Sequence, residues 1–257
     1  MANESRDGTG TQRAREAPSV DVALEELVHS REERELRIAA LNPRLTEDLA
    51  LALLNRRELP AGVIEDLARN QAVMKHRKVL IALVRHQHTP RHVSVPVMRR
   101  LYTFELLQLT LFPALAADLR VAMEQTLIAR LESITAGERL TLAHRGPGGL
   151  MGALLHDKDD RVIRAALENS ALTEDRLVRA LMSPDAPEAL ILAVCRHSKW
   201  SLRRDIRTAL LLNPNTPLAQ LLALAQSLPV VVLRDLLQHT SMDSRIKSYL
   251  EMELERR

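Results

Sequence analysis

A short segment that recurs at a fixed spacing is the feature that most constrains this chain. "NSALTED" at Asn169 and "NPNTP" at Asn213 begin 44 residues apart, and so do "NPRLTED" at Asn42 and "HQHTP" at His86. Each copy has a polar residue first and Thr, with Pro or acidic residues, three or four positions later. Self-similarity at a fixed period predicts an array of stacked structural repeats.

Each copy has the pattern of one helix ending and another beginning. The apolar residues before Asn213 recur at helical spacing and define one face: Leu202, Ile206, Ala209 and Leu210. Asn213 is expected to end this helix because Asn tolerates the left-handed backbone conformation. Thr216 is the expected N-cap of the next helix, with Pro217 in its first turn.

The same pattern predicts short antiparallel helix pairs. Leu221 and its counterpart Leu177 are expected to face the core between repeats. Half of the 44-residue spacing suggests about 22 residues for each helical hairpin. The composition agrees with an all-helical chain, because 46% of residues are apolar and only 2% are aromatic, with Leu and Ala in the places that rings and β-branched residues take in strands.

The copy at Asn213 also resembles a known repeat family. Ala209, Asn213, Pro214, Thr216, Pro217 and Leu221, followed by "ALA", match the pattern of the leucine-rich repeat variant. This short two-helix repeat builds bacterial α-solenoids and is similar in architecture to HEAT and armadillo repeats. The resemblance implies a superhelical scaffold with an extended concave surface. Some members carry an iron–sulfur cluster on an N-terminal cysteine cluster, which this chain, with Cys195 alone, does not share.

We therefore expect an all-α, right-handed α-solenoid of antiparallel helix pairs without a β-sheet. Residues 1–20 are expected to be a disordered tail, because they are polar and mixed in charge, and residues 21–257 a single domain. Repeat blocks at about 36–101 and 140–240 are joined in this interpretation by longer helices over about 102–135, including one from about Ala114 to Ile134.

The number of cysteines and the length of the apolar runs indicate the cellular compartment in which we expect the chain. A lone Cys195 excludes a disulfide within the chain and a cysteine-rich metal site. The N-terminus lacks an apolar signal region, and no apolar run reaches the ~20 residues that a membrane span needs. We expect a cytoplasmic protein with no membrane span and no cofactor; the sequence leaves its oligomeric state open.

Several clusters suggest chemistry, and each has a simpler structural explanation. His86, His88 and His92 have no acidic or cysteine neighbour to complete a metal site. The glycines of "HRGPGGLMG" follow no strand, so a loop before a helix near Leu150 is expected instead of a phosphate cradle. The remaining candidates are the following: His156, Asp157, Asp159 and Asp160, interpreted as helix-capping groups; Cys195 and His197, which do not face each other on a helix; and Trp200, interpreted as packing. No catalytic residue and no metal ligand is predicted.

Charge segregation is the one pattern that points outward from the fold. No acidic residue lies between Asp66 and Glu105, a segment that contains eight Lys and Arg residues. Lys75, Lys78, Arg85 and His86 would share one face of an amphipathic helix. The candidate partner-binding residues are Lys75, Lys78, Arg85, His86, Arg91, Arg99 and Arg100.

Three functions are compatible with these patterns. The first is a non-enzymatic interaction scaffold or adaptor that binds an acidic protein or peptide. The second is a solenoid that binds nucleic acid through its phosphate backbone, without base stacking because rings are scarce. The third is a HEAT-like enzyme such as a DNA glycosylase, for which no nucleophile, base and orienting group occur at a recognisable spacing. A solvated charged face with no partner is the structural alternative for the basic segment.

Overall fold

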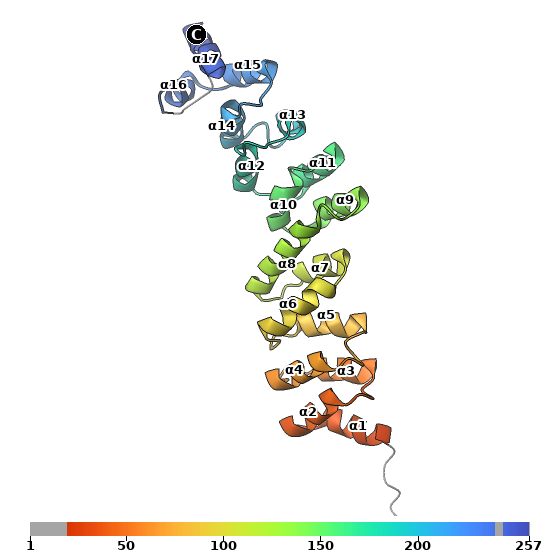
Figure 1. The fold of residues 1–257 in the computed structure, drawn as a ribbon. Coiled ribbons are helices and arrows are strands. Elements are labelled where there is room, and N and C mark those ends of the chain that lie inside the picture. Colours follow the sequence, from red (N-terminus) through yellow and green to blue (C-terminus); the bar gives the residue numbers. More distant parts are fainter. Residues whose placement is uncertain (1–19, 240–243, 257) are drawn as a thin grey trace, which may run out of the picture. The chain divides into compact units, whose positions relative to one another are not determined.

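The computed structural model describes residues 20–239 and 244–256, and all regular structure within them is helical. These ranges hold seventeen α-helices and no strand (Figure 1). The expected all-α class is confirmed. The predicted disordered tail lies outside the described residues except for Val20, the first residue of α1. The chain divides into two compact units, Met1–Met98 and Arg99–Arg257.

In the first unit, helices alternate between two rows. Its helices are α1 (Val20–His29), α2 (Glu33–Leu41), α3 (Glu47–Leu54), α4 (Ala61–Arg69), α5 (Arg77–Arg85) and all but the end of α6 (Arg91–Arg100). α2 packs on α4, while α1 packs on α3 and α3 on α5. α1, α2 and α3 therefore each contact the helix two places along the chain, and apolar residues such as Leu53, Ile64 and Leu83 fill the space between.

The second unit repeats this alternation in its N-terminal and central parts. Its helices are α7 (Thr103–Thr110), α8 (Ala117–Arg130), α9 (Ala136–Arg145), α10 (Gly148–Leu154), α11 (Asp160–Glu168), α12 (Glu174–Leu181), α13 (Glu188–Arg196), α14 (Arg204–Leu212), α15 (Leu218–Ser227), α16 (Val230–His239) and α17 (Ser244–Glu255). One row holds α8, α10, α12 and α14, and the other holds α9, α11 and α13. α15 packs on α14, and α17 packs on both α15 and α16.

The 22-residue hairpin predicted from the sequence is wrong. A 44-residue interval, such as Asn42 to His86, spans three helices, because Asn42 follows α2 and His86 follows α5. Hydrogen bonds that join one helix end to the corresponding end two helices earlier bridge 28 to 30 residues at Asn70 and 30 at His86. The recurring segment marks helix ends in both rows, so half of its period does not correspond to a helix pair.

An internal duplication underlies the recurrence. α2 to α6 and α11 to α15 begin and end at positions that differ by 127 residues throughout, so Glu33–Leu41 corresponds to Asp160–Glu168 and Arg77–Arg85 to Arg204–Leu212. Residues that directly precede helices are identical at this offset, including Thr46 with Thr173 and Pro60 with Pro187. Identical helix boundaries follow because capping residues and prolines determine where helices start.

The polar residue after each repeated helix has a different role from the one expected. Asn213 has φ −79° and ψ 122°, and no described non-glycine residue has a positive φ, so the predicted left-handed cap is wrong. The Asn213 side chain is instead buried, where it donates to the Leu181 carbonyl and accepts from the Asn215 N–H. It closes its own turn and bonds to the end of α12 at the same time.

Two other details of the predicted helix junction also change. Thr216 does not cap α15: its hydroxyl donates to the Leu210 carbonyl at 2.6 Å, and Pro217 is the N-cap. Leu202 precedes α14 and is 69% exposed, so it is not part of the apolar face. Leu177 and Leu221 face the core as predicted, since both are buried.

The segment between the repeat blocks is less elongated than expected. α8 is the longest described helix, with 14 residues, but α7 has only eight, and α8 is shorter than the predicted 114–134 helix. The glycine cluster begins α10 at Gly148, two residues before the expected start near Leu150. A Cβ on Gly149 would lie 1.7 Å from the Glu124 carboxylate of α8, so a larger residue there would require this side chain to move aside.

Candidate functional site

The segment predicted to form a basic helix face, with Lys75, Lys78, Arg85 and His86, is only partly helical. α5 buries Val79, Leu80, Leu83 and Val84, and this leaves Lys78 and Arg85 exposed on the opposite side. Lys75 lies in the turn that precedes α5, so it is exposed but not on the predicted helix face. A turn forms there because Val73 is drawn into the core, fully buried, before the helix begins.

His86 does not belong to the exposed basic face. It is the C-cap of α5, and its ring Nε2 lies 2.8 Å from the Arg56 carbonyl while Nδ1 accepts from the His88 N–H. This is the arrangement of Asn213, with ring nitrogens in place of the amide. The ring therefore has a structural role, and the prediction that His86 belongs to the exposed basic face is wrong.

The other predicted binding residues lie on α6. Arg91 is its first residue and is exposed, while Arg99 and Arg100, also exposed, are its last residues and belong to the second unit. The seven predicted residues are thus not brought together on one element. The basic surface considered below is defined as Lys75, Lys78 and Arg85 of the first unit.

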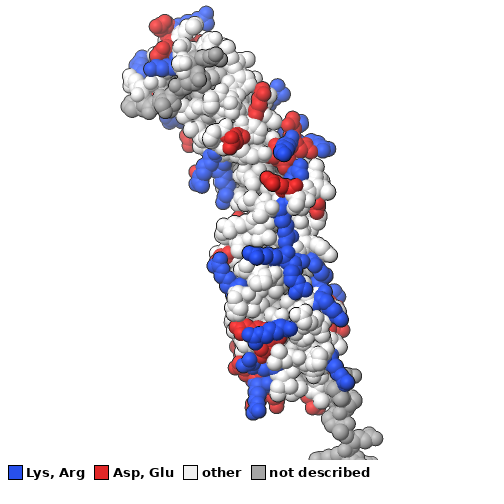
Figure 2. Space-filling model, in the orientation of Figure 1, with Lys and Arg blue, Asp and Glu red and all other residues white. Residues whose placement is uncertain are grey.

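Few carboxylates lie near the basic surface. His76, which lies between Lys75 and Lys78 in the sequence, contacts Glu47 at 3.2 Å, and His92 contacts Glu65 at 3.4 Å. Within the described ranges, Lys75 and Lys78 form no ion pair. On the face shown in Figure 2, Lys and Arg side chains predominate around α5, whereas basic and acidic side chains are interspersed over α2 and α4.

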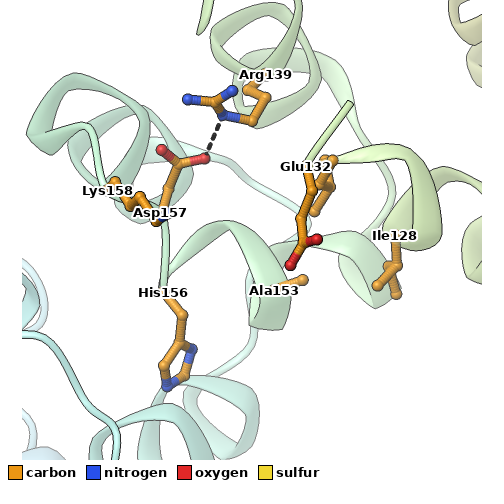
Figure 3. Close-up of a pocket in the computed structure, with 8 residues that line it drawn as sticks. Ile128, Glu132, Arg139, Ala153, His156, Asp157 and Lys158 are labelled. Atoms are coloured by element: carbon orange, nitrogen blue, oxygen red, sulfur yellow. Dashed lines mark hydrogen bonds and ion pairs between the residues drawn. The ribbon is translucent and has the colours of Figure 1, made fainter. Parts of the chain in front are cut away.

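A cleft of about 570 Å³ lies in the second unit (Figure 3). The end of α8 contributes Ile128, the turn after α8 contributes Glu132, and Asp157 comes from the loop after α10. The Asp157 carboxylate, 7% exposed, accepts from Arg139 Nε of α9 at 2.7 Å and from the Asp159 N–H. Arg139 also donates to the Ile134 carbonyl. The pair thus joins α9 to the α10–α11 loop.

The remaining groups around this cleft do not form an acid–base set. Figure 3 shows the His156 ring pointing away from the Arg139–Asp157 pair, and its Nδ1 lies 3.0 Å from the Gly152 carbonyl. Asp159 caps α11, where it accepts from the Arg161 N–H and guanidinium, and these bonds lower its pKa to about 2. A carboxyl group with that pKa is ionised near neutral pH and cannot donate a proton there. The predicted capping role of Asp159 is confirmed.

The three clustered histidines do not converge. His88 Nδ1 lies 3.3 Å from the Leu59 carbonyl, whereas His86 and His92 contact Arg56 and Glu65. No group of three His, Cys, Asp or Glu residues able to hold a metal ion occurs in the part of the chain that the structure describes.

The surroundings of Cys195 and Trp200 indicate structural roles for both side chains. Burial raises the pKa of the Cys195 thiol, which reduces the fraction of reactive thiolate. The nearby His197 ring accepts from the N–H groups of Lys199 and Trp200. Trp200 is 2% exposed and its indole N–H donates to the Leu167 carbonyl, which confirms its packing role.

One surface was missed by the sequence reasoning. A groove of about 570 Å³ lies between α12 and α14, and it is lined by Glu174, Asp175, Val178, Met182, Asp205, Thr208, Ala209 and Leu212. At the 127-residue offset, Asp205 and Leu212 occupy the places of Lys78 and Arg85. Extending the match between Asn42 and Asn169 along the chain would have pointed to this position.

The comparisons with known proteins identify no relative. No protein-family model matches the chain, and neither a search of curated proteins nor one of solved structures finds a significant match. Among the described helices, none combines the length and the apolar character that a membrane crossing requires.

Proposed function

We propose that this chain is a right-handed α-solenoid of the HEAT-like, variant-repeat type that acts as a non-enzymatic adaptor in the cytoplasm. The two-row packing of its helices supports the solenoid, because stacked helix pairs give extended surfaces suited to binding another chain. The lone, half-buried Cys195, which has no second cysteine in the chain to pair with, agrees with a reducing compartment.

The basic surface of α5 supports an acidic protein segment as the partner. Lys75 and Lys78 are exposed and unpaired among the described residues, in a segment without acidic residues from Arg69 to Phe104. Like-signed charges that are not neutralised within the protein attract a partner of opposite charge and accelerate its association. The two unpaired lysines, Lys75 and Lys78, are the observation that carries the proposal.

A protein partner is favoured over nucleic acid by the neighbouring helix. Glu47, in the first turn of α3, contacts His76 immediately beside this surface, and α3 packs on α5. A phosphate backbone carries a charge at every step and would meet this carboxylate, whereas a peptide can place a neutral or basic residue there.

Charge reversal tests the proposal. Lys75→Glu with Lys78→Glu should leave helicity unchanged, because both side chains are exposed and neither contributes to the core. Binding of a fluorescent Glu-rich peptide, measured by anisotropy at low salt, should weaken about tenfold or more, because two attractions become repulsions. Wild-type binding should fade as salt rises.

The matched control reverses two exposed lysines elsewhere, Lys158→Glu with Lys247→Glu. This variant has the same net charge and should retain wild-type affinity. Equal affinity of wild type and the Lys75/Lys78 variant for the peptide would overturn the proposal. Tighter binding of a mixed-sequence oligonucleotide than of the peptide, with a steep salt dependence, would replace it with the nucleic-acid function.

A further inference from the structure

The groove between α12 and α14 combines an apolar surface with an acidic rim. Val178 and Met182 of α12 and Leu212 of α14 line it, and Met182 is 49% exposed. Its volume, about 570 Å³, falls within the range of ligand clefts, about 300–1,000 Å³. Apolar side chains exposed in a concave surface indicate a binding site more strongly than the same side chains scattered singly over the protein.

The charged residues that line this groove are all acidic. They are Glu174 and Asp175 in the first turn of α12 and Asp205 in the first turn of α14. Asp205 forms no ion pair with a described residue.

The other two carboxylates have arginine partners at the rim. Asp175 pairs with Arg179, and Glu174 lies 3.9 Å from Arg203. The Arg179 and Asp175 side chains are 75% and 67% exposed, so their pair is worth little and a bound cation can replace the arginine at small cost.

We propose that this groove binds a basic amphipathic segment of a partner protein, with aliphatic side chains against Val178, Met182 and Leu212 and Lys or Arg side chains at the acidic rim. An amphipathic helix that lays its apolar face in a hydrophobic groove is a common mode of peptide recognition. The charge of the rim determines which helices are accepted, because like charges at the rim repel. The binding described here is separate from that of the α5 surface.

The corresponding segment of the chain shows how three residue differences alter this surface. At the corresponding places between α3 and α5, Lys78 replaces Asp205, Arg85 replaces Leu212 and Asn55 replaces Met182. The helices and their boundaries are the same, and Glu174 and Asp175 have acidic counterparts in Glu47 and Asp48. The α3–α5 surface therefore carries charges of both signs, whereas the charged residues that line the α12–α14 groove are acidic alone.

Exchanging these residues provides the test. Three labelled peptides of about 14 residues are compared by anisotropy: one with Leu on one helical face and Lys on the other, one with Leu and Glu, and one with Ala and Lys. The Lys75→Glu/Lys78→Glu variant, otherwise unchanged, serves as the host protein, so that the α5 surface does not bind the acidic peptide. It should bind the Leu/Lys peptide at least tenfold more tightly than the other two.

In this host, Asp205→Lys with Leu212→Arg should weaken Leu/Lys binding about tenfold or more, and Met182→Asn should weaken it several-fold. Circular dichroism checks that each variant folds, and Arg164→Lys, an exposed change outside the groove, is the control. Equal binding of Leu/Lys and Ala/Lys peptides, or unchanged Leu/Lys affinity in the folded Asp205/Leu212 variant, would overturn the inference. Because the host lacks Lys75 and Lys78, the two residues on which the proposed function rests, this result is independent of the proposed function.

Discussion

The segments α2–α6 and α11–α15 have the same helix boundaries but different surfaces and different internal packing. Ala50 and Leu53 of α3 correspond to Leu177 and Ala180 of α12, and all four are buried. The large and the small side chain have exchanged places one helical turn apart. The comparison teaches that the repeat maintains total core volume and helix ends, while the side chain at a given core position can change.

The helix-ending residues vary in a parallel way. Asn70 corresponds to His197 and His86 to Asn213. In each case the side chain accepts from a backbone N–H two residues later, and three of them contact a main-chain carbonyl of an earlier helix end: Asn70 with Ala40, His86 with Arg56 and Asn213 with Leu181. His197 Nε2 instead faces Glu168 at 3.2 Å. Any side chain with a donor and an acceptor at this separation can fill the position.

The largest expected effect tests the core exchange. Leu177→Ala should lower the free energy of unfolding by about 2 to 5 kcal/mol, because it leaves a cavity beside α12. Adding Ala180→Leu, which reproduces the arrangement of α3, should recover most of that loss. Urea unfolding followed by circular dichroism measures both variants. A double variant no more stable than Leu177→Ala would show that the two α-helices are not packed equivalently.

A smaller effect is expected at the helix ends. Asn213→Ala leaves the buried Leu181 carbonyl and the Asn215 N–H without their partner, which should cost about 1 to 3 kcal/mol. Asn213→His should cost less, because His86 makes both contacts at the corresponding position. Thermal unfolding ranks the two variants. If His is as damaging as Ala, the helix ends of the two segments are not interchangeable.

The smallest effect concerns the N-caps of α2 and α11. Asp159 accepts from the Arg161 N–H, whereas its counterpart Glu32 makes no side-chain capping bond. The Arg161 bonds lower the Asp159 pKa from 3.8 to about 2. Its contribution to stability is therefore present above the ordinary pKa and lost as pH falls through about 2.

Carboxyl chemical shifts followed by NMR between pH 6 and about pH 1.5 would show this titration. Arg161→Gln removes the guanidinium and should return the Asp159 midpoint toward its ordinary value. A wild-type midpoint near 3.8 would mean that the cap of α11 is no stronger than that of α2.

Local features of the fold were predictable from the sequence. The all-helical class, the burial of Leu177 and Leu221, the N-cap at Asp159 and the packing of Trp200 depend on spacing and side-chain chemistry within a few residues. The number of helices within one 44-residue interval could not be predicted in this way, because similar segments follow helix ends in both rows of helices. The candidate surface was predicted as a set of charges, but its shape was not.

By itself the sequence determined that this chain folds into helices, where several of them start, and that one segment is strongly basic. These properties depend on periodicity, capping and charge, which act over short distances along the chain. Only the tertiary structure decided that His86 turns inward to Arg56, that Lys75 precedes α5, and that α12 and α14 form an apolar groove with an acidic rim. Some of these outcomes join residues about 28 or more positions apart, and the others depend on which side chains the core can accommodate. Both are determined by tertiary packing and not by local sequence.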